Sequence, residues 1–94
     1  MHVITKKRIL LAAKAFPESA GALIAWYTIV EKNNFNNHAE LKMTFNSVDK
    51  VNNLYVFNIA GNKLRLIASI HFNRQKIYIR EILSHTEYDK GNWK

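Results

Sequence analysis

The stretch LYVFNIAGNKLRLIASIHFNRQKIYIREIL, residues 54–83, decides the fold class of this chain. Apolar and polar side chains alternate along its runs LYVFNI, KLRLIASI and KIYIREIL, which is the period of a strand with one buried face. The segments AGN and FNRQ between the runs have the composition of tight turns. The stretch therefore predicts three antiparallel strands joined by hairpins.

Two helices are predicted before these strands, over about residues 5–16 and 18–32. Thr5 is the expected N-cap of the first helix, and Pro17 ends it. Apolar residues recur at helical spacing in both helices, and the second is expected to be largely buried. The expected apolar positions are Ile9, Leu10, Ala13 and Phe16 in the first helix, and Leu23, Ile24, Trp26, Tyr27, Ile29 and Val30 in the second.

The remaining segments complete the predicted architecture. Residues 1–4 favour a short strand that can join the sheet, residues 38–45 form a helical turn or an irregular segment, and residues 46–53 form a loop. Helices first and strands second predict an α+β fold, with two N-terminal helices packed on a small, mainly antiparallel sheet of about four strands. The length of 94 residues indicates a single domain, residues 1–94.

Composition excludes several kinds of site. The chain has no cysteine, which excludes disulfides, thiolate zinc sites and cysteine catalysis. Its longest apolar run, AGALIAWYTIV at residues 20–30, is about half the length of a membrane span. The start MHV lacks the charged and apolar regions of a signal peptide. We therefore expect a cytoplasmic protein with no membrane partner.

Positive charge is in excess, because 14 Lys and Arg residues stand against 7 Asp and Glu residues, for a formal net charge of +7. A field of this sign attracts polyanions, and nucleic acid is the usual partner of a small protein of this charge. The alternative is a protein that is basic without such a partner. The positions of the charged side chains have to decide between the two.

Strand parity predicts which side chains share a face of the sheet. A two-residue loop at residues 73–74 would pair Ser69 with Tyr78, Ile67 with Arg80 and Arg65 with Ile82, and a Gly61-Asn62 turn would pair Asn58 with Arg65. The expected core face then holds Leu64, Leu66, Ala68, Ile70, Ile77, Ile79 and Leu83, with Glu81 as its one polar member. The expected polar face holds Lys63, Arg65, Ile67, Ser69, His71, Lys76, Tyr78, Arg80, Ile82 and Ser84.

A cationic cluster is expected where the last strand runs into His85 and Tyr88. Lys63, Arg65 and Arg80 share the polar face near that end. The arginine fork binds phosphate oxygens in pairs, lysine adds a point charge, and histidine or tyrosine rings can stack on an unpaired base. The alternative is that these charged residues only solvate the exposed face of the strand and have no binding or catalytic role. The added histidine and tyrosine favour a phosphate site.

Such a cluster has the groups that a ribonuclease needs. RNA supplies its own nucleophile, the 2′-OH, so the protein has to provide a base, an acid and cations that stabilise the phosphorane. His85 can donate or accept a proton near neutral pH, and Tyr88 can donate or stack. Glu87 and Asp89 are expected to be local charge partners or turn formers.

A metal site is the competing interpretation of His71, His85, Glu87 and Asp89, because imidazole and carboxylate groups bind divalent ions. Their spacing matches no ligand motif such as H-x-x-x-H, and the cationic surroundings disfavour an added cation. The chain also lacks a Walker A loop, a dinucleotide-binding fingerprint and a G-x-S-x-G motif. We expect no metal and no other cofactor, and we interpret His2 and His38 as ordinary surface or loop histidines.

The run YVFNIAGNKLRLIASIHFNRQKIYIREILSHTEYDKGNW, residues 55–93, resembles the HigB family of toxin–antitoxin mRNA interferases, within the wider RelE/ParE toxin group. The start MHVIT followed by a basic helix, and the segment AELKMTFNSVD before the sheet, are also similar to this family. Ala60 in the turn, where glycine is commoner, and Glu81 are the departures. The resemblance covers nearly the whole chain and implies a RelE-like fold.

The resemblance implies a toxin that enters the ribosomal A site and cuts translated mRNA through the 2′-OH without metal. Its implied partner is a HigA-type helix-turn-helix antitoxin from the same operon, and operator DNA would be contacted only indirectly through the antitoxin complex. By matching position, the resemblance implies a catalytic role for Lys63, Arg65, Arg80, His85 and Tyr88. Which of these is the base and which the acid stays open.

In this interpretation Arg65 and Arg80 hold the scissile phosphate, and Lys63 binds phosphate or acts as base. His85 is the general acid or base, and Tyr88 stacks or shares proton transfer. The other residues expected to contact RNA are Lys6, Lys7, Arg8, Asn58, Arg74, Lys76, Tyr78 and Lys90. The alternatives are a ParE-like inhibitor of gyrase, which does no RNA chemistry, and a non-catalytic RNA- or ribosome-binding module.

Overall fold

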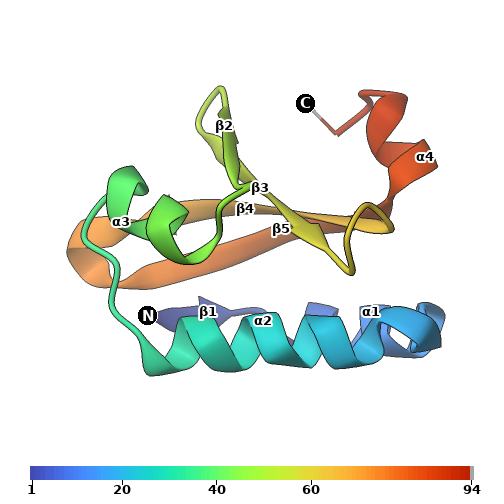
Figure 1. Ribbon diagram of the computed structural model, residues 1–94, viewed down its shortest axis with the longest axis horizontal. Helices are drawn as coiled ribbons and strands as arrows, with labels where there is room; N and C mark the ends of the chain where they lie inside the picture. The colour runs from blue at the N-terminus through green and yellow to red at the C-terminus, as the bar shows by residue number, and fades with distance from the viewer. Residues whose placement is uncertain (94) are drawn as a thin grey trace.

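A five-stranded sheet forms the centre of the computed structural model, which describes residues 1–93 (Figure 1). Its strand order is β1-β5-β4-β3-β2. The strands span His2–Ile4 (β1), Asp49–Val51 (β2), Leu54–Ile59 (β3), Leu64–His71 (β4) and Lys76–Ser84 (β5). β1 pairs with β5 in parallel and the other neighbours are antiparallel, which confirms the predicted mainly antiparallel sheet.

The extra strand is β2, which the sequence predicted as part of a loop. It pairs with β3 over only three residues, from Asp49 opposite Val56 to Val51 opposite Leu54. Asn52 turns the chain between them with φ 58°, a left-handed conformation that asparagine tolerates well. A strand this short has no alternating pattern that a sequence can display.

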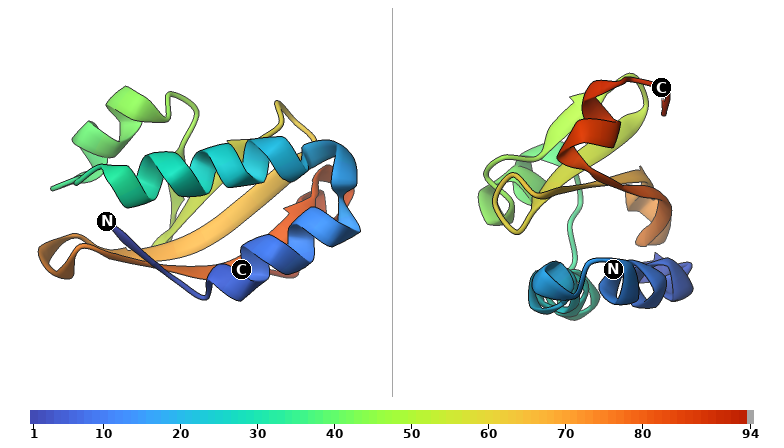
Figure 2. Two further views of the ribbon diagram at one scale, coloured as in Figure 1. Left: turned by 90° about the horizontal axis from the view of Figure 1, so that it is seen from below. Right: turned by 90° about the vertical axis from the view of Figure 1, so that its right-hand side faces the viewer.

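The helices cover the two faces of the sheet unequally. α1 (Lys6–Ala15) and α2 (Ala20–Lys32) lie side by side on one face, and the short 3₁₀ helix η1 (Pro17–Ser19) connects them (Figure 2). α3 (His38–Thr44) follows at one end of the sheet. α4 (His85–Asp89) continues from β5 and rises on the face away from α1 and α2 (Figure 1).

The first helix begins and ends close to the predicted positions, and its buried stripe differs from the prediction at Leu10 and Ala12. Thr5 is the N-cap residue with φ 69°, and its side chain makes no capping hydrogen bond; its hydroxyl donates instead to the Ile4 and Ile79 carbonyls. Ile9 and Ala12 are buried, whereas Leu10 is half exposed. Of the four predicted apolar positions only Leu10 was wrong, because Ile9 is buried and Ala13 and Phe16 pack against the core.

The second helix is the main support of the core. Leu23, Trp26 and Val30 are at most 3% exposed, but Ile24 and Ile29 are 44% and 38% exposed, so the buried stripe is narrower than predicted. The Trp26 ring meets Phe57 of β3 edge-on with centroids 5.2 Å apart. Such aromatic pairs add packing energy beyond the area they bury.

A β-bulge in β5 changes the predicted faces of the sheet. Ser69 pairs with Tyr78 and Asn58 with Arg65 as expected, but the register shifts between Ile67 and Ala68. Arg80 is the extra residue, so that Ile67 pairs with Glu81.

Beyond the bulge every side chain of β5 changes face relative to the prediction. Arg65 pairs with Leu83 instead of Ile82, which places Leu83 outside the core face where the prediction had it. Ile82, expected on the polar face, packs against the core instead. A one-residue slip inverts a strand because successive side chains point to opposite faces.

The face away from α1 and α2 is not uniformly polar. Val56 and Ile67 are 3% and 1% exposed there, and Arg65 is 9% exposed. Their strand neighbours, such as Phe57 and Leu66, belong to the main core, so these side chains point the other way. α4 packs against β4 and β5, and together they make a sheltered region around Arg65. None of the helices within residues 1–93 has the length and apolar content that crossing a membrane requires.

Candidate active site

The turn from β5 into α4 is held by a capping box. The Ser84 hydroxyl accepts a hydrogen bond from the Glu87 backbone N–H at 3.2 Å, and the Glu87 carboxylate accepts one from the Ser84 N–H at 3.1 Å. Hydrogen bonds from the Ser84 backbone and then its side chain lower the pKa of the Glu87 carboxyl, with Lys90 adding a smaller attraction. Glu87 is therefore a turn-forming residue, as the sequence predicted.

This turn places α4 beside the start of β4. The backbone N–H of His85 donates to the Lys63 carbonyl at 3.0 Å, so the two segments are joined directly. His85 is thereby fixed next to residues that precede it by about twenty positions in the chain.

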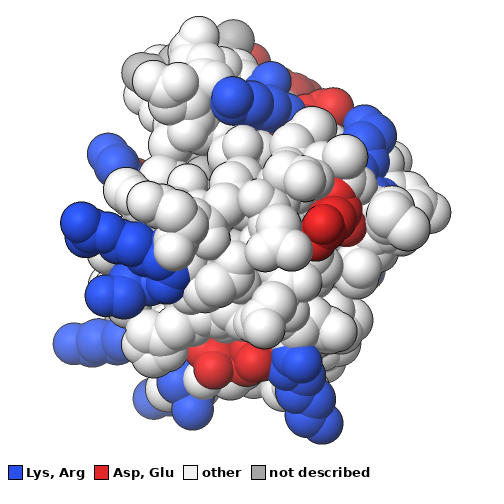
Figure 3. Space-filling view, turned by 90° about the vertical axis from the view of Figure 1, so that its left-hand side faces the viewer, with Lys and Arg blue, Asp and Glu red and all other residues white. Residues whose placement is uncertain are grey.

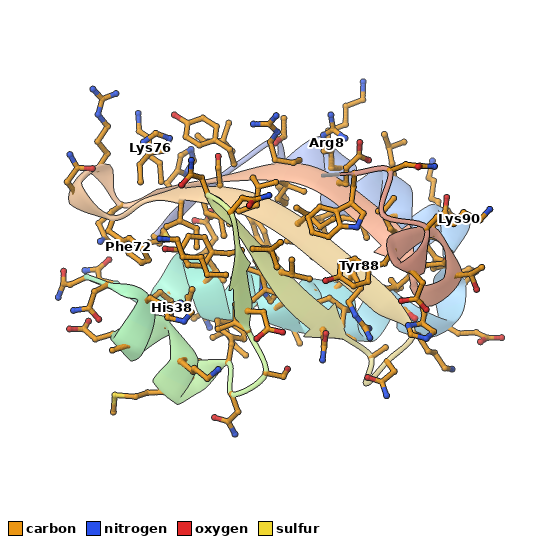
Figure 4. All side chains as sticks on the ribbon, turned by 90° about the horizontal axis from the view of Figure 1, so that it is seen from above. Arg8, His38, Phe72, Lys76, Tyr88 and Lys90 are labelled. Atoms are coloured by element: carbon orange, nitrogen blue, oxygen red, sulfur yellow. The ribbon has the colours of Figure 1, made fainter. Side chains whose placement is uncertain are left out.

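Arg65, His85 and Tyr88 come together on this side of the sheet. The Arg65 Nη2 atom lies 3.4 Å from His85 Nδ1, and its Cζ lies 5.5 Å from the centroid of the Tyr88 ring. The Arg65 Nη1 atom donates to the Leu64 carbonyl at 3.3 Å. Figure 4 shows Tyr88 extending over the sheet from α4. A guanidinium, an imidazole and a phenol therefore share one small region.

Asp89 is the second partner of His85. Its carboxylate lies 3.2 Å from His85 Nε2, one helical turn away in α4. Guanidinium nitrogens only donate, so the contact with Arg65 assigns Nδ1 as the acceptor and places the imidazole proton on Nε2, facing Asp89. Asp89 thus has a local role beside His85, as predicted, and its carboxylate faces the Nε2 side of the ring.

Lys63 lies at the margin of this group. Its ammonium is 3.6 Å from the Glu18 carboxylate in an exposed ion pair, and both residues line a hollow that also includes His85. Arg80, in contrast, lines a different hollow with Arg8, Ser69 and Tyr78. The bulge is the reason, because it turns Arg80 out of the predicted alignment with Arg65.

A metal-binding constellation is not found among residues 1–93, where no group of at least three His, Asp or Glu side chains is placed to hold an ion. The residues weighed for such a site are dispersed. His71 packs edge-on against Tyr78 with centroids 5.2 Å apart, whereas His85 lies with Arg65.

Comparison with known proteins supports the family that the sequence resembles. The sequence profile of the HigB toxin family, described as the RelE-like toxic component of a toxin–antitoxin system, matches residues 19–91. The chain belongs to the HigB toxin family. It is 41% identical over 92 residues to the "mRNA interferase toxin HigB" of Escherichia coli K12, covering 95% of this chain and 88% of that protein.

Other HigB relatives show similar coverage. The "mRNA interferase HigB" of Shigella flexneri is also 41% identical over 92 residues, again covering 95% and 88% of the two chains. The protein of the same name from Escherichia coli O6:H1 is 33% identical over 93 residues, covering 96% of this chain and 90% of the relative. A HigB-family toxin implies an antitoxin partner.

Several basic residues of this HigB-family chain lie near β1 and α1. Lys6, Lys7 and Arg8 are exposed in the first turn of α1, with the Lys6 ammonium 5.1 Å from the centre of the Tyr27 ring. Figure 3 shows Lys and Arg side chains at several places around the rim of one face, with several of them along its left edge. Figure 4 shows Arg8 and Lys76 at the β1 edge and Lys90 beside α4.

The remaining predicted contacts have different settings. Arg74 is exposed at the β4–β5 turn, within the 3₁₀ helix η2 (Phe72–Arg74), and Asn58 is exposed on β3. Tyr78 is half-buried beside His71, and Lys90 lines a hollow with Trp93. Together these groups lie on several sides of Arg65 and His85, not in one strip.

Sequence reasoning missed two features near this region. Trp93 stacks on Tyr88 with ring centroids 5.0 Å apart and planes 15° apart, and its Nε1 donates to the Tyr88 carbonyl at 3.0 Å. The sequence signal available for this contact was a pair of aromatic residues, Tyr88 and Trp93, five positions apart after the last predicted strand. The second feature is the hollow beside His85. Residues 15–19, 63–64 and 84–86 form it, and no local sequence pattern predicts that segments so far apart in the chain will meet.

His38 differs from the prediction as well. It is half-buried, and among residues 1–93 its Nδ1 atom has no hydrogen-bond partner. Its ring lies 5.5 Å from that of Tyr55, whose own pKa is raised by burial. His38 is therefore a packing residue of α3 and not an ordinary surface histidine, whereas His2 is exposed near Glu31 as expected.

Proposed function

We propose that this HigB-family toxin is an mRNA endoribonuclease that cuts translated mRNA and so stops translation and growth. The observation that carries the proposal is the meeting of Arg65, His85 and Tyr88, which puts a phosphate-binding fork beside two proton-handling side chains. Relatives at 41% identity that carry the name mRNA interferase support it.

The chemistry requires no group beyond those of the protein and the RNA. A base removes the proton of the 2′-OH, the 2′ oxygen attacks the adjacent phosphorus, and the bond to the 5′ oxygen breaks as that oxygen takes a proton from an acid. The products are a 2′,3′-cyclic phosphate and a 5′-hydroxyl end. Cations stabilise the added negative charge of the phosphorane between these steps.

The geometry favours one division of roles. Arg65 holds the phosphate, which on binding takes the guanidinium from His85 and leaves the Nδ1 lone pair free to act as base. Tyr88 shares proton transfer or stacks on the neighbouring base, and Lys63 adds charge at the margin. Arg80 is assigned to RNA binding and not to the scissile phosphate, because it lines a different hollow.

The partners follow from this function. We infer a HigA-type helix-turn-helix antitoxin, with operator DNA contacted only through the toxin–antitoxin complex, and the ribosomal A site as the place where mRNA is cut. The site of action is then the cytoplasm, where mRNA is translated. The exposed Lys6, Lys7 and Arg8 supply salt-sensitive contacts to ribosomal RNA.

The deciding experiment maps RNA 5′ ends after induction of the toxin, with and without a translation inhibitor. Discrete cuts that disappear when translation is blocked support the proposal, and His85→Gln expressed to the same level is the control that should lack them. DNA-damage signalling without cuts would indicate a gyrase inhibitor instead. Ribosome binding without cuts would indicate a non-catalytic module.

A further inference from the structure

A hollow of about 430 Å³ lies between η1 and the start of α4, next to His85. Its walls come from residues 15–19 at the α1–α2 junction, residues 63–64 at the start of β4, and residues 84–86. Figure 2 shows α4 above and the α1–α2 junction below at this end of the molecule. The volume is in the range of sites for small ligands, which is roughly 300–1,000 Å³.

The apolar part of the hollow is suited to a flat ring. Phe16, which is half-buried, Pro17 and Leu64 line it. Aromatic faces and other flat apolar surfaces are the surfaces on which proteins stack unpaired nucleobases.

Ser19 adds a polar group to the wall of the hollow. Within residues 1–93 its hydroxyl makes no hydrogen bond, including no capping bond to α2. The hydroxyl is not among the fully buried unpaired polar atoms of the described residues, so it is accessible from the hollow. It can therefore donate a hydrogen bond to a ligand there or accept one.

The mouth of the hollow carries groups of both charges. Lys63 and His85 are on the side that leads to Arg65, where the phosphate would lie. Glu18 lies there in an exposed ion pair with Lys63, at 3.6 Å. Its carboxylate can only accept hydrogen bonds, so it selects a ligand edge that carries N–H donors.

We propose that this hollow binds the base of a nucleotide flanking the scissile phosphate, and that Glu18 and Ser19 read its edge. This inference rests on the proposed ribonuclease function and adds its base preference. Guanine fits best, because its N1–H and exocyclic amino group are adjacent donors that a single carboxylate accepts together. Stacking between Phe16 and Pro17 holds the ring, and Lys63 neutralises the attached phosphate.

The direct test is an NMR titration of the purified full-length toxin with GMP, AMP, CMP and UMP, and separately with inorganic phosphate. GMP should bind most tightly and shift the amide signals of Ser19 and Thr86. Inorganic phosphate should shift the amide signals of Arg65 and Lys63 and should not shift the signal of Ser19. Absence of shifts at Ser19 and Thr86 with all four nucleotides overturns the proposal.

Two variants make the titration specific. Ser19→Ala should weaken GMP binding about three- to tenfold, the value of one neutral hydrogen bond, without lowering the unfolding temperature, since no protein hydrogen bond is lost. Thr86→Phe should block the hollow, whereas Thr44→Phe, at the exposed end of α3, should not. GMP affinity that is unchanged in both Ser19→Ala and Thr86→Phe contradicts the site.

Cleavage mapping tests the assignment of Glu18. In cells that express Glu18→Gln, the fraction of cuts flanked by guanine should fall relative to the parent toxin, and Glu40→Gln on α3 is the matched control. An unchanged distribution rejects the role of Glu18. Because the titration needs no cleavage, a toxin that binds GMP at Ser19 but cuts no mRNA would refute the ribonuclease function and not the base site.

Discussion

Arg65 of β4 and His85 of α4 face each other, with Nη2 of the arginine 3.4 Å from Nδ1 of the histidine. Guanidinium nitrogens can only donate, so a hydrogen bond between the two side chains requires a lone pair on His85 Nδ1. A bound phosphate is the natural group to come between them. The relationship therefore connects the resting geometry of the site to its proposed chemistry.

Arg65→Lys should lower the cleavage rate of ribosome-bound mRNA by about a hundredfold, the loss typical of removing one transition-state donor. Lysine keeps the charge but not the planar fork that holds two phosphate oxygens. The measurement is single-turnover cleavage at saturating toxin. Circular dichroism and antitoxin binding of the variant should match the parent, and a parent-like rate would remove Arg65 from the site.

Asp89→Asn should lower cleavage by about tenfold through His85, which the Asp89 carboxylate orients from 3.2 Å. Asp89 acts as a positioning residue here, so activity alone is not a sufficient readout. The ¹⁵N chemical shifts of His85 should show a smaller population of the Nε2–H tautomer in Asp89→Asn, and Asp89→Glu should restore part of it. An unchanged tautomer population would show that Asp89 contributes only to α4 and does not orient the His85 imidazole.

Arg80→Ala should weaken RNA binding without changing the rate of cleavage at saturation, because the bulge places Arg80 in the hollow with Arg8 and Tyr78. The slope of log affinity against log salt should become shallower by about one unit, the contribution of one phosphate contact. Binding to a short RNA at several salt concentrations measures this. A large loss of rate at saturation would return Arg80 to the scissile phosphate.

Glu87→Ala should lower the unfolding temperature at pH 7 by a small amount, because it removes half of the capping box at α4. The folded-state pKa of Glu87 is lowered, so its contribution is present above the ordinary glutamate pKa and is lost as the pH falls through the folded value. The difference between parent and variant should therefore shrink below about pH 4. Thermal unfolding at pH 7 and at acidic pH tests this, and an equal difference at both would refute it.

The fold class followed from the sequence because alternation along three strands is a local signal. The runs around Tyr55, Leu66 and Ile79 show which residues are buried, and the hairpins at residues 60–63 and 72–75 set the register that pairs Asn58 with Arg65 and Ser69 with Tyr78. The same parity placed Arg65 on the face away from α1 and α2, close to the chain that leads into His85. Residue types and spacing thus placed Arg65 near His85, but they also aligned Arg80 with Arg65, and the bulge removes that alignment.

Tertiary structure alone decided which of those residues meet. A bulge is one unpaired residue with no sequence signature of its own, so the inversion of β5 beyond Arg80 had to be observed. The contacts of His85 with Arg65 and Asp89, and the hollow with Ser19, depend on where a capped helix of five residues folds back on the sheet. The sequence shows the alternation of apolar and polar residues over a few positions, and this alternation predicts the strands. The contacts between segments about twenty or more residues apart are decided by packing.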